Sequence, residues 1–221
     1  MTAALLFTFI QVSIWNHLLR TCIAERGTHM YHKGITREIV IQAAVRLAEE
    51  RGWNSFSMNQ LAESLGIKTA SLYRHVSGLD DVISEVGMYA LSSQMEAQLK
   101  AVEGLHGADA VRALAHAYRQ YALEHPELYQ IILSMHRISN KKMESHSYMI
   151  PEPMMRVLDD FGLSETEKRH WQRILRCFMH GFIEQEEAGY FVYYPENREE
   201  TYRLGIECFL DGLLHRKNTG N

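Results

Sequence analysis

Between residues 36 and 83 the chain is divided into short helical segments, each bounded by a helix-start signal and a glycine. The first segment, 36–51, repeats apolar residues at the i, i+3, i+4, i+7 spacing of one helix face: Val40, Ala43, Ala44, Leu47 and Ala48. Thr36 is placed to cap the start of this helix and Gly52 to end it. The pattern predicts a small helical domain, because segments this short need neighbours to bury their apolar faces.

A second helix is predicted to begin at Ser57. The sequence SMNQ (57–60) is a capping box, in which the Ser57 hydroxyl accepts from the amide of Gln60 and the Gln60 side chain reaches back. Gly66 is placed to end this helix in a left-handed conformation. Its buried face is formed by Leu61, Ala62 and Leu65.

A third helix is predicted over about residues 69–76, with Leu72 and Val76 turned inward. Two helices joined by a tight turn form a helix-turn-helix, in which the second helix enters the major groove of DNA and meets base edges. Hydroxyls, an imidazole, a phenol and basic groups bind bases or phosphates, and a methyl group can touch thymine. The residues expected on DNA are therefore the outward ones: Lys68, Thr69, Ala70, Ser71, Tyr73, Arg74 and His75.

Charge agrees with a local DNA contact. Residues 33–79 contain six Lys or Arg and four Asp or Glu, so their net charge is +2, whereas the whole chain has −4. The protein is therefore not a basic nucleic-acid coat, and a contact with DNA must come from one patch.

Segment 36–83 resembles the DNA-binding domain of the TetR/AcrR family of bacterial transcriptional regulators. The resemblance is carried by Ala43-Ala44, Gly52, the Ser57 cap, Leu61-Ala62, Gly66 and above all SLYRHV (71–76). It implies that Ser57 and Asn59 lie near phosphates and that the outward residues of the third helix lie on DNA. Three positions depart from the family pattern. Lys68 and Gly78 replace frequent capping residues, and Leu79 replaces a lysine that often holds a phosphate.

The remainder of the chain is also read as helical, which gives an all-α fold of about nine helices. The expected domains are an extension at 1–29, a helix-turn-helix domain at 30–80, a connecting helix at 81–106 and a ligand-sensing and dimerisation domain at 107–221. One alternative is local: YFVYY (190–194) can be read as a strand. The apolar stretch 3–15 is shorter than the roughly 20 residues of a membrane span and lacks the basic start of a signal peptide, so we hypothesise that translation begins at Met30.

Segments 116–133 and 170–191 resemble one branch of TetR-type C-terminal domains, marked by Trp and His-Gly in a long helix. The resemblance implies that the last two long helices pair with their copies in a homodimer, which would read a palindromic operator. The residues expected at this interface are Gly181, Gly205, Phe209 and Gly212.

The same resemblance implies that a small molecule is sensed in the C-terminal domain. Apolar and aromatic residues could line a cavity for an apolar ligand, although each of them could equally be plain core. These residues are Tyr118, Tyr121, Tyr129, Met135, Met154, Met155, Trp171, Phe178 and Phe182. The expected mechanism is a population shift, in which the ligand prefers a conformation that no longer matches the operator.

Other classes of protein have weaker support in the sequence. It contains no GxSxG, GxGxxG, P-loop or HExxH motif, so we expect no catalytic residue, cofactor or metal and no enzyme. Two alternatives remain: a metal site or enzyme that uses His180 and Glu184, and a helix-turn-helix that serves only as an interaction module. The three cysteines have no CxxC spacing, which favours thiols in a reducing cytoplasm, and we expect no membrane contact.

Overall fold

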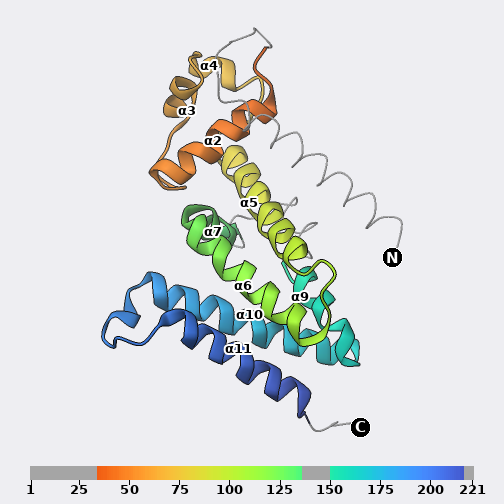
Figure 1. Cartoon of the computed structure of the whole chain (residues 1–221). Coiled ribbons are helices and arrows are strands. Elements are labelled where there is room, and N and C mark those ends of the chain that lie inside the picture. The colour runs from red at the N-terminus through yellow and green to blue at the C-terminus, as the bar shows by residue number, and fades with distance from the viewer. Residues whose placement is uncertain (1–33, 136–149, 217–221) are drawn as a thin grey trace. The chain divides into compact units, whose positions relative to one another are not determined.

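The computed structural model describes residues 34–135 and 150–216, and within these ranges the chain forms helices and turns without strands (Figure 1). The predicted all-α class is thus confirmed. The hypothesis about the start at Met30 lies outside the described residues. The α-helices are α2 Arg37–Arg51, α3 Met58–Ser64, α4 Thr69–Leu72, α5 Leu79–Ala101, α6 Gly107–Glu124, α7 Pro126–Ser134, α9 Glu152–Val157, α10 Glu165–Glu187 and α11 Arg198–Leu214.

The chain divides into two compact units, which are described separately. Among the described residues, the N-terminal unit comprises 34–93 and 125–135, and the C-terminal unit comprises 94–124 and 150–216. Helix α7 therefore belongs with the helix-turn-helix, although the sequence suggested a sensing domain from residue 107 onward. None of the described helices is both long and apolar enough to cross a membrane.

The predicted helix starts in the N-terminal unit are confirmed. The Thr36 side chain accepts from the amide of Ile39, and the capping box of Ser57 and Gln60 is complete in both directions. Gly66 has a φ of 65°, the left-handed conformation that glycine adopts without strain at a helix end. Each residue of the predicted apolar face of α2 is buried.

Helix α4 is shorter than predicted, because it ends at Leu72 rather than near Val76. After Leu72 the backbone continues as turns, in which the amides of His75 and Val76 both donate to the Leu72 carbonyl, at 2.8 and 3.0 Å. The carbonyl of His75 accepts instead from the Arg37 guanidinium at 2.6 Å. A side chain from α2 thus holds the backbone that follows α4.

Helix α7 packs on α2 inside the N-terminal unit. The Glu127 carboxylate accepts from the backbone amide of Trp53 at 3.1 Å, and the ring of His125 lies 2.7 Å from the Glu49 carboxylate. Helix α5 also comes close to this region, since a Cβ on Gly87 would lie 2.8 Å from the Met135 sulfur. The N-terminal unit is therefore one packed body of α2, α3, α4, α7 and the first part of α5.

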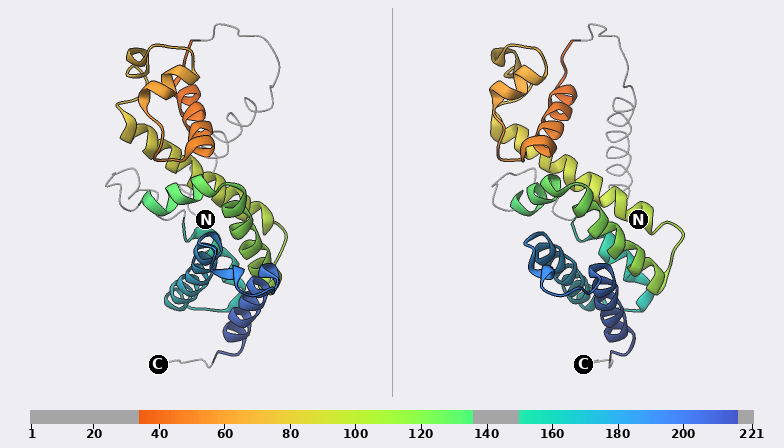
Figure 2. Two further views of the ribbon diagram at one scale, coloured as in Figure 1. Left: turned by 90° about the vertical axis from the view of Figure 1, so that its left-hand side faces the viewer. Right: turned by 60° about the vertical axis from the view of Figure 1, so that its left-hand side comes forward.

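The C-terminal unit contains α6, α9, α10 and α11, and α10 and α11 run alongside each other (Figure 2). Helix α10 begins with a complete capping box of Ser164 and Glu167, which the sequence analysis did not identify. The strand reading of residues 190–194 is wrong, because Tyr190–Val192 form a 3-10 turn that follows Gly189.

Aromatic side chains fill the contact between α10 and α11. Trp171 meets Phe209 edge-on with ring centroids 5.4 Å apart, and Phe178 stacks on Tyr202 at 5.6 Å. Gly205 is required here, since a Cβ at this position would lie 2.1 Å from the Phe178 ring. Gly205 therefore makes room for a ring of its own chain.

Candidate nucleic-acid interface

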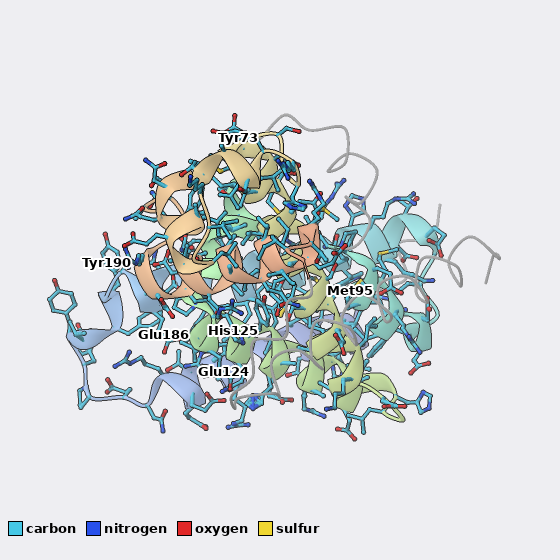
Figure 3. The ribbon with its side chains drawn as sticks, turned by 90° about the horizontal axis from the view of Figure 1, so that it is seen from above. Tyr73, Met95, Glu124, His125, Glu186 and Tyr190 are labelled. Atoms are coloured by element: carbon cyan, nitrogen blue, oxygen red, sulfur yellow. The ribbon has the colours of Figure 1, made fainter. Side chains whose placement is uncertain are left out.

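The outward side of α4 and of the residues that flank it carries the polar and basic side chains that the sequence predicts for DNA. Leu72 is completely buried and Val76 nearly so, and these two side chains anchor the segment to the core. Tyr73, by contrast, is 57% exposed and points away from the ribbon of its own unit (Figure 3). Lys68, Ala70 and Arg74 are exposed and Thr69, Ser71 and His75 are half-buried. The structure thus brings all seven predicted residues of this segment together on one surface.

Helix α3 is tied to α4 at this surface. The Thr69 hydroxyl donates to the Asn59 side-chain oxygen at 2.9 Å. Because that oxygen is occupied, the side-chain NH₂ of Asn59 is the group that can donate to a phosphate. The Ser57 hydroxyl accepts from the Gln60 amide, so any phosphate contact at Ser57 shares this hydroxyl with the cap.

A network around Arg37 holds the end of the reading segment, here defined as residues 68–76. The Arg37 guanidinium donates to Asp81 at 2.8 and 3.1 Å and to Glu85 at 2.8 Å, in addition to the His75 carbonyl. The hydrogen bonds that Arg37 donates to Asp81 raise the pKa of Arg37, burial opposes this shift, and Glu85 adds to it. Arg37 therefore joins the start of α2, the end of the reading segment and the first turns of α5.

Arg37 could not be predicted from the sequence, because its partners lie 38 to 48 residues away and no local pattern marks them.

The positions that depart from the family pattern, Gly78 and Leu79, lie at the start of α5 in the same region. The amide of Ser77 donates to Asp81 at 2.8 Å, so Asp81 supplies a cap from inside α5. Leu79 is the half-buried first residue of α5, and it carries no charge for a phosphate.

The predicted ligand residues are divided between the two units. Tyr129 and Met135 are buried in the N-terminal unit, whereas the other seven lie in the C-terminal unit. Trp171, Phe178 and Phe182 contact aromatic rings of α11 or of the turn after α10. Their role in ligand binding stays a prediction, as does that of the remaining members of the set, Tyr118, Tyr121, Met154 and Met155.

The metal alternative rests on two residues of one helix. His180 and Glu184 lie one turn apart on α10, and burial lowers the pKa of His180. No group of three or more His, Cys, Asp or Glu side chains that could hold a metal is found in the part of the chain that the structure describes.

Comparisons with known proteins agree with this geometry. Residues 40–86 match the family model of bacterial regulatory proteins of the tetR family, and residues 111–209 match the model of the tetracyclin repressor-like C-terminal domain. The chain is 30% identical over 182 residues to the HTH-type transcriptional regulator YobS of Bacillus subtilis, an alignment that covers 82% of this chain and 94% of YobS.

Solved structures show the same fold. A protein of unknown function from Rhodococcus sp. RHA1 superposes with a TM-score of 0.74 at 19% identity, over 85% of this chain and 100% of that one. The TetR family protein ActR of Streptomyces coelicolor, solved in complex with (S)-DNPA, gives a TM-score of 0.58 at 20% identity, over 82% and 98% of the two chains.

Proposed function

Because the chain belongs to the TetR family of bacterial transcriptional regulators, we propose that it represses transcription by binding a palindromic operator as a homodimer. A small molecule bound in the C-terminal unit would then release the operator. The observation that carries the DNA-binding part is the surface of residues 68–76, where polar and basic side chains lie outside and Leu72 and Val76 lie inside. In this proposal Thr69, Ala70 and Ser71 meet bases, and Lys68, Tyr73, Arg74 and His75 meet phosphates.

Replacing Arg74 with Ala tests the phosphate contacts. We expect weaker operator binding at every sequence and a slope of log K against log salt that is smaller by about one, because one fewer counterion is released. Fluorescence anisotropy at several salt concentrations measures both quantities. The control is Arg203→Ala, which removes an exposed cation in the C-terminal unit and should leave the slope unchanged. An unchanged slope for Arg74→Ala would remove this residue from the interface.

Support for the homodimer comes from the outer side of α10 and α11. Large apolar side chains there are exposed, among them Ile174 at 52%, Leu204 and Leu214, and the thiols of Cys177 and Cys208 are exposed as well. The side of α10 that its own chain buries carries Gln172, Met179 and Ile183, and Ile174 lies outside it. Apolar residues that gather on the outside of paired helices are typical of a surface that a partner covers.

The glycines on these helices are not equivalent in the proposed dimer. A Cβ on Gly181 would meet nothing within 4 Å, whereas one on Gly212 would make ordinary contact with Trp171 at 3.6 Å. Gly205 is already explained by Phe178, and Phe209 is buried against Trp171. Packing within the single chain therefore does not require a glycine at position 181. Close approach of a second copy of the chain would explain why this position has no side chain.

Replacing Gly181 with Leu should weaken the dimer by at least about tenfold, because the new side chain has room in one chain but none against a partner. Sedimentation across a concentration series measures the dissociation constant. The matched control is Arg173→Leu, an exposed position of α10 that lies about 80° around the helix from Gly181. Equal dissociation constants for the two variants would place the interface elsewhere.

A further inference from the structure

Two glutamines occupy core positions of α5 in the C-terminal unit. The buried face of this helix continues through Gln94, Met95 and Gln98, and Val102 follows directly after its end at the i, i+1, i+4, i+8 spacing of one side. Gln94 is 5% exposed and Gln98 is 2% exposed. Polar residues at core positions lower stability unless every hydrogen-bonding group is satisfied or the residue has a function.

Neither amide is fully satisfied by the protein. The Nε2 of Gln94 and the Oε1 of Gln98 are buried and have no hydrogen-bond partner in the structure. A donor or acceptor left in this state costs about 1–3 kcal/mol. The spacing of four residues places the two side chains next to each other on the helix, yet the free donor of one does not bond the free acceptor of the other.

We propose that Gln94 and Gln98 bind the polar group of the regulator's ligand, and that this ligand is an uncharged molecule carrying a hydrogen-bond acceptor beside a donor. A carboxamide or a lactam has this pattern: its carbonyl accepts from Gln94 Nε2, and its N–H donates to Gln98 Oε1. A charged group is disfavoured, because two neutral amides do not compensate the desolvation of an ion. This inference rests on the proposed function, in which the C-terminal unit binds a small molecule.

The proposal sharpens the expectation of an apolar ligand. Met95 and Val102 lie on the same buried face as the two amides, so the ligand that fits this face has an apolar body and one neutral polar end. It also explains why residues that weaken the free protein occupy this face, since the cost of the unpaired amides is recovered when the ligand binds.

The test uses the full-length protein and four probes of one chain length: octanamide, N,N-dimethyloctanamide, octanoate and octylamine. Binding is measured by calorimetry or by the shift in melting temperature. We expect the wild-type protein to bind octanamide about tenfold more tightly than each of the other three, because only the primary amide offers both an acceptor and a donor without charge. Equal affinities for the four probes, or binding of none of them, would overturn the proposal.

Substitution by methionine separates the two contacts, since it keeps the length of the side chain and removes the amide. In Gln98→Met, octanamide and its dimethyl derivative should bind equally, because the acceptor for the ligand N–H is gone. In Gln94→Met, both should bind about tenfold more weakly than to wild type, because the donor to the carbonyl is gone. Lys100→Met, a change at an exposed position of the same helix outside this face, should keep the preference of the wild type.

A second readout distinguishes a ligand site from a structural role. Without probe, Gln94→Met and Gln98→Met should melt at the wild-type temperature or up to about 4 °C above it, because each removes an unsatisfied buried group. Lower melting temperatures would show that the amides support the fold, and would contradict the proposal. Operator binding is measured on the same samples. If the wild-type protein binds its operator but shows no preference for the amide, only this inference is contradicted. If the wild-type protein binds no operator, the proposed function is contradicted.

Discussion

Replacing Arg119 with Met is expected to lower the free energy of unfolding of the C-terminal unit by about 3–5 kcal/mol. Arg119 is 8% exposed, and its guanidinium binds the buried Glu186 carboxylate with two hydrogen bonds of 2.8 and 2.9 Å and also binds Glu199. The rings of Phe182 and Tyr202 lie against its face. The hydrogen bonding of Arg119 to the Glu186 carboxylate is the main cause of the raised pKa of Arg119. Methionine keeps the apolar contacts but leaves Glu186 charged without its bidentate partner.

The same helix offers a matched control. Arg112 also makes a bidentate pair, with Glu207 at 2.7 Å, but this pair lies at the surface. Arg112→Met should therefore cost only about 0.2–1 kcal/mol. Chemical denaturation of both variants measures the difference. The double variant Arg119→Met/Glu186→Met should recover much of the loss, because the buried carboxylate is removed together with its bidentate partner. Equal losses for the two single variants would contradict the assignment of Arg119 as a buried, structural cation.

Replacing Arg37 with Met is expected to lower the free energy of unfolding of the N-terminal unit by about 2 kcal/mol and to weaken operator binding. The figure is at the lower end for hydrogen bonds to charged groups, because a third of the Arg37 side chain is exposed and water screens its pairs with Asp81 and Glu85. The operator effect follows from the bond to the His75 carbonyl, which fixes the end of the reading segment. Loss of this bond lets the segment depart from the geometry that fits DNA.

Arg46→Met is the control for Arg37, since Arg46 is exposed on the same helix and the substitution removes the same charge. Denaturation and operator titration on both variants separate the effect of the network from that of one lost cation. If Arg37→Met and Arg46→Met lose the same stability and the same affinity, then the network does not position the reading segment.

The helix-turn-helix could be predicted in detail because its signals are local. The capping box at Ser57 and the left-handed glycine at Gly66 depend on residues that lie within a few positions of each other in the sequence, and the structure confirms both. The inward positions of Leu72 and Val76 follow from a spacing of four. The resemblance to the TetR family then assigned the function, and the comparisons confirm the family.

What the sequence could not show depends on partners far along the chain. The bond that holds the carbonyl of His75 comes from Arg37, and the requirement for a glycine at 205 comes from the ring of Phe178. The apolar spacing in α10 could not show that Ile174 is exposed, because an amphipathic helix with apolar residues on two sides does not reveal which side its own chain covers. The glutamines of α5 were missed for a related reason: their chemistry becomes visible only when burial and the absence of partners are known together.

The most direct measurement of the central claim is a titration of the full-length protein into DNA from the promoter region of its own gene, followed by anisotropy at low and at physiological salt. A regulator that reads DNA through residues 68–76 should bind one palindromic site at least about a thousandfold more tightly than unrelated DNA. Tyr73→Ala, which removes the most exposed aromatic side chain of this surface, should lower that affinity while the fold remains intact. Equal binding of the wild-type protein to both DNAs would contradict the account. So would a specific site that Tyr73→Ala and Arg74→Ala bind as tightly as the wild-type protein does.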